Sequence, residues 1–119
     1  TVTEQREAVI RLRLIGHSGI EQDVEAVIDT GFNDFLALSS GHIKALSLPF
    51  AAPLLATLAD GSVVETSSYR AAVMWDEQRR DVLVIACDGG ALVGMSMLYG
   101  YNLYLEANDG GVVTIDRQV

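Results

Sequence analysis

Short apolar runs separated by glycine-containing turns dominate the pattern of hydrophobic and polar positions along the chain. Ile10, Leu12 and Leu14 alternate with a second face that carries two arginines, and this period of two predicts a strand over residues 9–14. The same signals predict further strands over residues 24–28, 35–38, 54–58, 63–75, 82–86, 103–106 and 112–115. The chain is therefore expected to be mainly β.

Two short segments favour helix instead. Residues 40–46 can form a short helix with Ser39 or Ser40 as its N-cap, because either hydroxyl can accept a backbone N–H of the first turn. Residues 95–99 are long enough for one or two helical turns, and Gly100 can end them because glycine accepts a left-handed backbone. One or two short helices are expected beside the strands.

Turn signals divide the chain between these elements. Residues 16–19 predict a turn between the first two strands. Asp60-Gly61 predicts a hairpin between residues 54–58 and 63–75, because both residue types tolerate positive φ. Residues 76–80 are predicted to form a polar turn. The chain contains no linker and no internal repeat, so a single domain is expected.

Composition narrows the classes of function. The 119 residues suit one domain, and the hydrophobic half of the composition excludes intrinsic disorder. The net charge of −8 argues against nucleic acid as a partner, and no apolar run reaches the roughly 18–20 residues of a membrane span. One cysteine, Cys87, cannot form an intrachain disulfide, which favours the cytoplasm. Its place at the end of an apolar strand predicts a small buried side chain.

Several chemical motifs are incomplete. A phosphate-binding loop over residues 89–96 would need lysine where the chain has Met95. Neither His17 nor His42 has a cysteine or histidine partner at ligand spacing, so no metal site is predicted. No cofactor is expected.

One constellation remains, Asp29-Thr30-Gly31, directly after the apolar run of residues 24–28. This order places a carboxylate at a strand end, on a loop that a hydroxyl can brace and a glycine can keep narrow. The alternative is an Asx-type turn without chemistry, and such a tripeptide arises by chance in about one chain of this length in forty.

The stretch VIDTGF resembles the active-site motif of the retroviral-type (retropepsin-like) aspartic proteases. Their second motif, two apolar residues and a glycine before a short helix, is matched by Leu92-Val93-Gly94, and Asp60-Gly61 lies where they carry a hairpin flap. Residues 7–116 follow the order of motifs in this family. The chain resembles the small stand-alone bacterial clan AA proteases more closely than the retroviral enzymes. Met95 stands where the retroviral enzymes have arginine, and the flap contains less glycine.

This resemblance implies a closed single-lobe β-barrel over residues 1–119, with the core at about 7–116, and an aspartic endopeptidase. Hydrolysis by aspartates needs two carboxyls that share one proton. The chain has a single Asp-Thr-Gly and is too short for two lobes, so a homodimer is expected, with a peptide or protein as substrate.

The resemblance also implies a role for each motif residue. Asp29 would be catalytic, Thr30 would brace the two loops across the dimer axis, and Gly31 would allow close backbone approach. Leu92, Val93 and Gly94 would support the loop. The flap that covers the peptide would consist of Ala59, Asp60, Gly61 and Ser62.

Other interpretations of the sequence remain open. A catalytically silent homologue could keep the dimer and the groove as a peptide-binding or scaffolding module. An unrelated β-barrel binding domain could carry an accidental Asp-Thr-Gly. Asp60-Gly61 could be an ordinary exposed turn.

Overall fold

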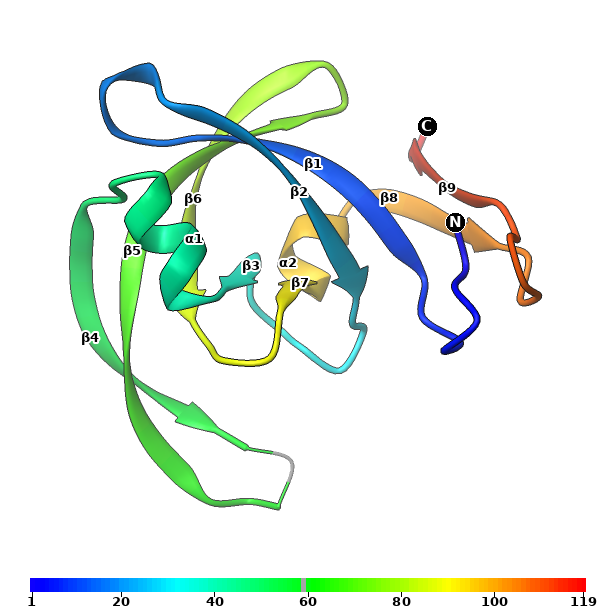
Figure 1. Ribbon diagram of the computed structural model, residues 1–119. Coiled ribbons are helices and arrows are strands. Elements are labelled where there is room, and N and C mark those ends of the chain that lie inside the picture. The colour runs from blue at the N-terminus through cyan, green and yellow to red at the C-terminus, as the bar shows by residue number, and fades with distance from the viewer. Residues whose placement is uncertain (59) are drawn as a thin grey trace.

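Six strands close into a barrel at the centre of the molecule (Figure 1). The computed structural model describes residues 1–58 and 60–119, so Ala59 of the predicted flap lies outside the described residues. Within that part, the strands are β1 (Val9–Ile15), β2 (Glu21–Ile28), β3 (Leu36–Leu38), β4 (Phe50–Thr57), β5 (Val63–Trp75), β6 (Gln78–Ala86), β7 (Ala91–Val93), β8 (Tyr101–Leu105) and β9 (Val113–Arg117). The α-helices there are α1 (Ser40–Ala45) and α2 (Met95–Leu98), and a 3₁₀ turn (His17–Gly19) joins β1 to β2.

The barrel is a mixed sheet in the order β1-β2-β7-β3-β6-β5, closed by antiparallel pairing of β1 with β5. The pairs β2–β7 and β3–β6 are parallel, and the other pairs of the ring are antiparallel. Parallel strands end at the same edge, so residues that directly follow β2 and β7 come together although they are far apart in sequence.

Alternating side chains build the core. Leu12 and Leu14 of β1 are buried, whereas Arg11 and Arg13, which alternate with them, are exposed and form ion pairs with Glu25 and Asp23 of β2. The helices add to the same cluster, and the fully buried side chains of the core include Leu14, Leu36, Leu38, Leu46, Val73, Val84, Val93 and Met97.

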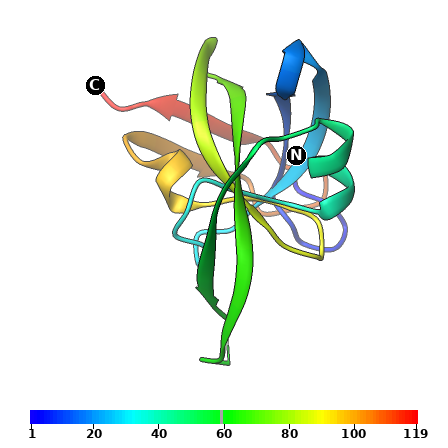
Figure 2. The ribbon, with the colours of Figure 1, turned by 90° about the vertical axis from the view of Figure 1, so that its left-hand side faces the viewer.

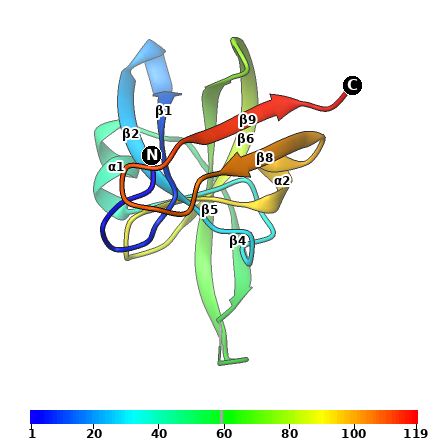
Figure 3. The ribbon, with the colours of Figure 1, turned by 90° about the vertical axis from the view of Figure 1, so that its right-hand side faces the viewer.

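Two hairpins extend from the barrel. The β4–β5 hairpin projects well beyond it, with β4 on the outer edge of β5 (Figure 2). The β8–β9 hairpin forms a separate sheet near the N-terminus (Figure 3). Backbone hydrogen bonds join Val2 to the turn of this second hairpin, because its N–H donates to Gly111 O and its C=O accepts from Gly110.

The predicted fold class, a mainly β closed barrel with one or two short helices, is confirmed. The turn at 76–80 is shorter than predicted, because Gln78, Arg79 and Arg80 belong to β6 and only Asp76 and Glu77 form the turn. None of the helices in the described part of the chain is long and apolar enough to cross a membrane.

The prediction that Cys87 is buried is wrong. The strand ends at Ala86, one residue earlier, and Cys87 begins the exposed loop that leads to β7. Its N–H donates to Leu38 O at 2.9 Å, so the backbone continues the β3–β6 pairing while the side chain lies outside the core.

Candidate active site

Asp29 is the first residue after β2 and lies beside the end of β7. Ile28 and Val93 are partners in the parallel pairing, and the N–H of Asp29 donates to Val93 O at 2.9 Å. The strand register therefore fixes the backbone of the carboxylate-bearing residue. Its side chain is half-buried, neither inside the core nor free in solvent.

The loop itself orients one oxygen of the carboxylate. The N–H of Gly31 donates to Asp29 Oδ1 at 2.9 Å, and the N–H of Phe32 donates to Asp29 O at 3.1 Å, which closes a tight turn. No hydrogen bond to Oδ2 is found within residues 1–58 and 60–119. The carboxylate thus has one oxygen held by the loop and one available to a water or a second carboxyl.

Gly94 allows the second motif to pack directly against this loop. A Cβ at Gly94 would lie 2.7 Å from Phe32 O and still closer to Asp34 O, both of them backbone atoms. The φ of Gly94 is −100°, which other residues adopt, so glycine is needed here for space rather than for conformation.

The first turn of α2 forms hydrogen bonds with residues 32–35, at the end of the Asp29 loop. Met95 N–H donates to Phe32 O at 2.8 Å, and Ser96 donates its N–H and its hydroxyl to Asn33 O. The N–H of Gly94 donates to Phe35 O at 2.9 Å. Free N–H groups at a helix start thus bind loop carbonyls. Sequence reasoning missed this role of Ser96; the available signal was its place in the first turn of the predicted helix.

A groove of about 480 Å³ runs from this loop to the β4–β5 hairpin. Gly31 and Phe32 border it at the loop end, and Leu92 contributes from β7. The opposite side consists of residues 54–58 of β4 and its end and 64–66 of β5. The groove thus joins the Asp29 loop to a long, partly apolar strand pair, a shape suited to an extended chain.

The predicted flap residues that the structure describes lie at the hairpin tip, beyond the residues that border the groove. Asp60 Oδ1 accepts from the N–H of Ser62 at 2.9 Å and from its hydroxyl, and Gly61 has a φ of +87°. The Ser62 hydroxyl, followed by its N–H, holds the pKa of Asp60 below its usual value. The tip is a tight turn stabilised by an ionised carboxylate.

Other predicted site residues divide between two surfaces. Leu92 and Val93 lie beside the Asp29 loop through the pairing of β7 with β2. Thr30 is exposed and borders a different hollow, next to Ile28, Leu103 and Leu105. The structure therefore brings Asp29, Gly31 and residues 92–94 together and turns Thr30 toward the side of the β8–β9 hairpin.

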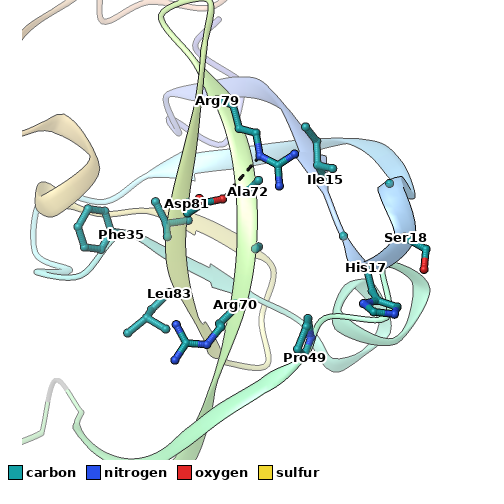
Figure 4. Close-up of a pocket in the computed structure, with 14 residues that line it drawn as sticks. Ile15, His17, Ser18, Phe35, Pro49, Arg70, Ala72, Arg79, Asp81 and Leu83 are labelled. Atoms are coloured by element: carbon teal, nitrogen blue, oxygen red, sulfur yellow. Dashed lines mark ion pairs between the residues drawn. The ribbon is translucent and has the colours of Figure 1, made fainter.

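A larger pocket of about 660 Å³ lies elsewhere, between the β1–β2 turn and strands β5 and β6 (Figure 4). Its basic side chains do not converge, because Arg79 is paired with Asp81 while Arg70 lies four residue pairs further along the strands (Figure 4). No residue of either motif borders this pocket, whereas Gly31 and Leu92 border the groove, so the groove is the better candidate site.

No group of three or more His, Cys, Asp or Glu placed to hold a metal ion is found in the part of the chain that the structure describes. The polar groups present at the loop are the Asp29 carboxylate, backbone N–H groups and the hydroxyls of Thr30 and Ser96.

Comparison with known proteins bears on the fold. No family model matches the chain, and no curated protein matches it either. Among solved structures, it is similar to EIAV protease complexed with the inhibitor HBY-793, with a TM-score of 0.58 and 17% identity, over 82% of this chain and 90% of that chain. The chain has a retropepsin-like fold.

Proposed function

We propose that this protein is an aspartic endopeptidase of the retropepsin-like type, of the kind found as small stand-alone clan AA enzymes in bacteria. It acts as a homodimer on peptide or protein substrates, with Asp29 as the catalytic residue. Neither nucleic acid nor a membrane surface is needed for this activity, and we place it in the cytoplasm.

One observation carries the proposal: in this chain, whose fold is similar to that of a retroviral protease, the Asp-Thr-Gly loop follows β2 and packs directly against Gly94. An accidental Asp-Thr-Gly would need no such bracing. Here a parallel strand partner, an internal hydrogen bond and a helix start all fix the loop that carries one carboxylate. This rigidity suits catalysis, because a misplaced acid–base pair loses much of its rate.

The proposed reaction uses two copies of Asp29, one from each protomer. One carboxylate removes a proton from a water as its oxygen bonds to the scissile carbonyl carbon, and the other, protonated, gives its proton to the carbonyl oxygen. Collapse of the tetrahedral intermediate breaks the C–N bond, the amine takes a proton from the first carboxyl, and the second carboxylate recovers its own from the hydroxyl. Each cycle consumes one water.

The dimer follows from the count of catalytic groups. The chain contains one Asp-Thr-Gly, and two carboxyls must approach within hydrogen-bond distance to share a proton. A twofold axis between the two Asp29 loops satisfies this requirement with identical chains. In this arrangement Thr30 belongs to the face that meets the partner, and each β4–β5 hairpin covers one half of the substrate.

The decisive experiment is peptide cleavage by the wild type and by Asp29→Asn. The amide is nearly isosteric with the carboxylate but cannot act as a general base, so we expect cleavage of a peptide library to fall to background. Circular dichroism and sedimentation of the variant should match the wild type, because the loop hydrogen bond from Gly31 can still be accepted by the amide oxygen.

Asp116→Asn is the matched control, since Asp116 is an exposed residue of β9 and the charge change is the same. It should retain wild-type cleavage. If the wild type folds and dimerises but cleaves no peptide, the alternative of a silent peptide-binding dimer replaces the enzyme. Cleavage by Asp29→Asn at the wild-type rate would show that another group is catalytic.

A further inference from the structure

The groove beside the Asp29 loop is acidic. Three carboxylate residues, Asp34, Glu65 and Asp88, are among those that border it. No lysine, arginine or histidine of the described part of the chain borders it. Its charge therefore has one sign.

Two of these carboxylates extend from backbone that is held in place. The C=O of Asp34 accepts from the N–H of Ser96 at 3.3 Å, in the loop fastened to α2. Asp88 follows Cys87, whose N–H donates to Leu38 O at 2.9 Å at the end of β6. Both residues are anchored on the barrel rather than on the projecting hairpin.

Glu65 differs from these two in its position. In an antiparallel strand successive side chains face opposite sides, and Glu65 lies between Val64 and Thr66. Thr66 faces the barrel, because its hydroxyl donates to Ala86 O at 2.7 Å, so Glu65 faces the other side with its cross-strand partner Leu55, which is 69% exposed. Glu65 therefore borders the groove from the face of the hairpin opposite to Thr66.

No cation among residues 1–58 and 60–119 forms an ion pair with a carboxylate of the groove. The ion pairs of the described residues involve Asp23, Glu25, Asp76 and Asp81, all outside the groove. The whole chain carries a net charge of −8, and the hairpin tip adds Asp60, whose pKa is held low by Ser62. A substrate entering the groove therefore meets a negative potential.

Apolar side chains complete the lining. Leu54, Leu58 and Leu92 border the groove together with Ala37 and Ile85. Lysine and arginine combine a hydrocarbon stem with a terminal cation, so they can cover such surface while the charged end reaches a carboxylate.

We propose that the groove selects peptides with a lysine or arginine close to the scissile bond, and that Asp34 and Asp88 are the specificity-determining residues. The inference rests on the proposed endopeptidase function and specifies its substrate class. A cationic peptide is attracted to the groove, and its basic side chain lies along the apolar wall with its charge toward these carboxylates. An acidic side chain at the same position is repelled.

The test compares three peptides that differ at one position near the cleaved bond, with lysine, norleucine or glutamate there. Norleucine keeps a straight hydrocarbon stem without the charge. At pH 6 and low salt we expect kcat/KM to be about fivefold higher with lysine than with norleucine, the size of one solvent-exposed ion pair, and lower still with glutamate. Raising the salt to 1 M should shrink the ratio, since charges are then screened beyond about 3 Å.

The variants Asp34→Asn, Asp88→Asn and their double should move the lysine-to-norleucine ratio toward one. Glu65→Gln should change it less, and Asp116→Asn should leave it unchanged. If peptides are cleaved but lysine gives no advantage in wild type, the specificity assignment is wrong and the protease remains. A salt-sensitive lysine preference that survives in the double variant would assign the selectivity to other groups. Cleavage of no peptide at all would contradict the proposed function instead.

Discussion

At the scale of single residues, the geometry around Asp29 depends on two glycines with different tasks. Gly31 donates its N–H to the carboxylate, and a Cβ there would lie 3.3 Å from Asp29 Oδ1. Gly94 lets the loop lie against the end of β7, where any side chain would meet backbone. Neither has a positive φ. Gly94 is required by the close approach of backbone, whereas at Gly31 the nearest atom belongs to the Asp29 side chain.

Gly94→Ala should destabilise the protein and remove its activity. The new methyl would meet the carbonyl oxygens of Phe32 and Asp34, which belong to backbone and cannot rotate away. Overpacking of this kind typically costs about 2 kcal/mol. Urea unfolding measures the loss. The control is Gly41→Ala in α1, where the nearest atom to the new Cβ is Ser39 Oγ at an ordinary 3.7 Å. This variant should be as stable as the wild type or more stable by up to about 1 kcal/mol. Equal stability of the two variants would contradict the close approach at Gly94.

The turn at Asp60 should be sensitive to acid. The pKa of Asp60 is lowered chiefly by the Ser62 hydroxyl and then by the Ser62 N–H. A lowered folded pKa means that this stabilisation is present above the ordinary value near 4 and is lost as pH falls through the lowered value. We expect the amide signal of Ser62 in NMR spectra to shift in that acidic range.

Ser62→Ala removes the larger cause and should raise the pKa of Asp60 toward its ordinary value. Ser40→Ala, at the far α1 helix, should leave it where it is. An unchanged pKa in Ser62→Ala would show that the hydroxyl is not the cause of the shift.

At the scale of elements, parallel pairing of β2 with β7 assembles the site, and tight turns hold the hairpins around it. The β5–β6 hairpin is closed by Asp76 and Glu77, with φ values of +53° and +61°. Asp76 also pairs with Arg117 and accepts from the Tyr101 hydroxyl, which ties the C-terminal hairpin to this turn. A left-handed backbone at two non-glycine residues is a local strain.

Glu77→Gly should therefore stabilise the protein. Glycine adopts positive φ without the steric cost of a Cβ, and Glu77 forms none of the ion pairs of the described residues. We expect a gain of about 1 kcal/mol, seen as a rise in Tm by several degrees. Gln78→Gly is the control: Gln78 lies within β6, where glycine weakens a strand, so it should lower Tm. A fall in Tm for Glu77→Gly would mean that the turn stores no strain at this residue.

At the scale of the whole molecule, activity is expected to depend on association. A protomer carries one Asp29, so the specific rate should rise with protein concentration at dilution and level off once the dimer is formed. Sedimentation should show the dimer over the same range.

Asp29→Asn separates association from catalysis, because it removes the general base while the loop hydrogen bond from Gly31 can still form. Its dimer should be as tight as that of the wild type. A fully active monomer would contradict the shared-proton mechanism, and a variant that no longer dimerises would show that Asp29 also contributes to association.

Much of the fold could be predicted from the sequence, because local patterns have local causes. Alternation in β1, the capping serine before α1 and the Asp60-Gly61 turn each follow from the preferences of a few neighbouring residues. The predictions were wrong where pairing with another strand sets the end of an element. Strand β6 begins at Gln78 because Gln78 pairs with Trp75, although the first residues of β6 are polar. Cys87 is exposed because its strand ends one residue before it.

The sequence by itself determined the carboxylate at a strand end, its glycine and the second apolar motif, because these are contiguous residues with a recognisable order. Only the tertiary structure decided that parallel β2 and β7 place Asp29 beside Gly94 and that Ser96 binds the loop. It also decided that residues 54–58 and 64–66 of the hairpin border the groove, rather than the residues of the hairpin tip. Those contacts join residues more than twenty and up to about sixty positions apart, and hydrophobic patterning sets which side of a strand is buried but not which distant strand lies next to it.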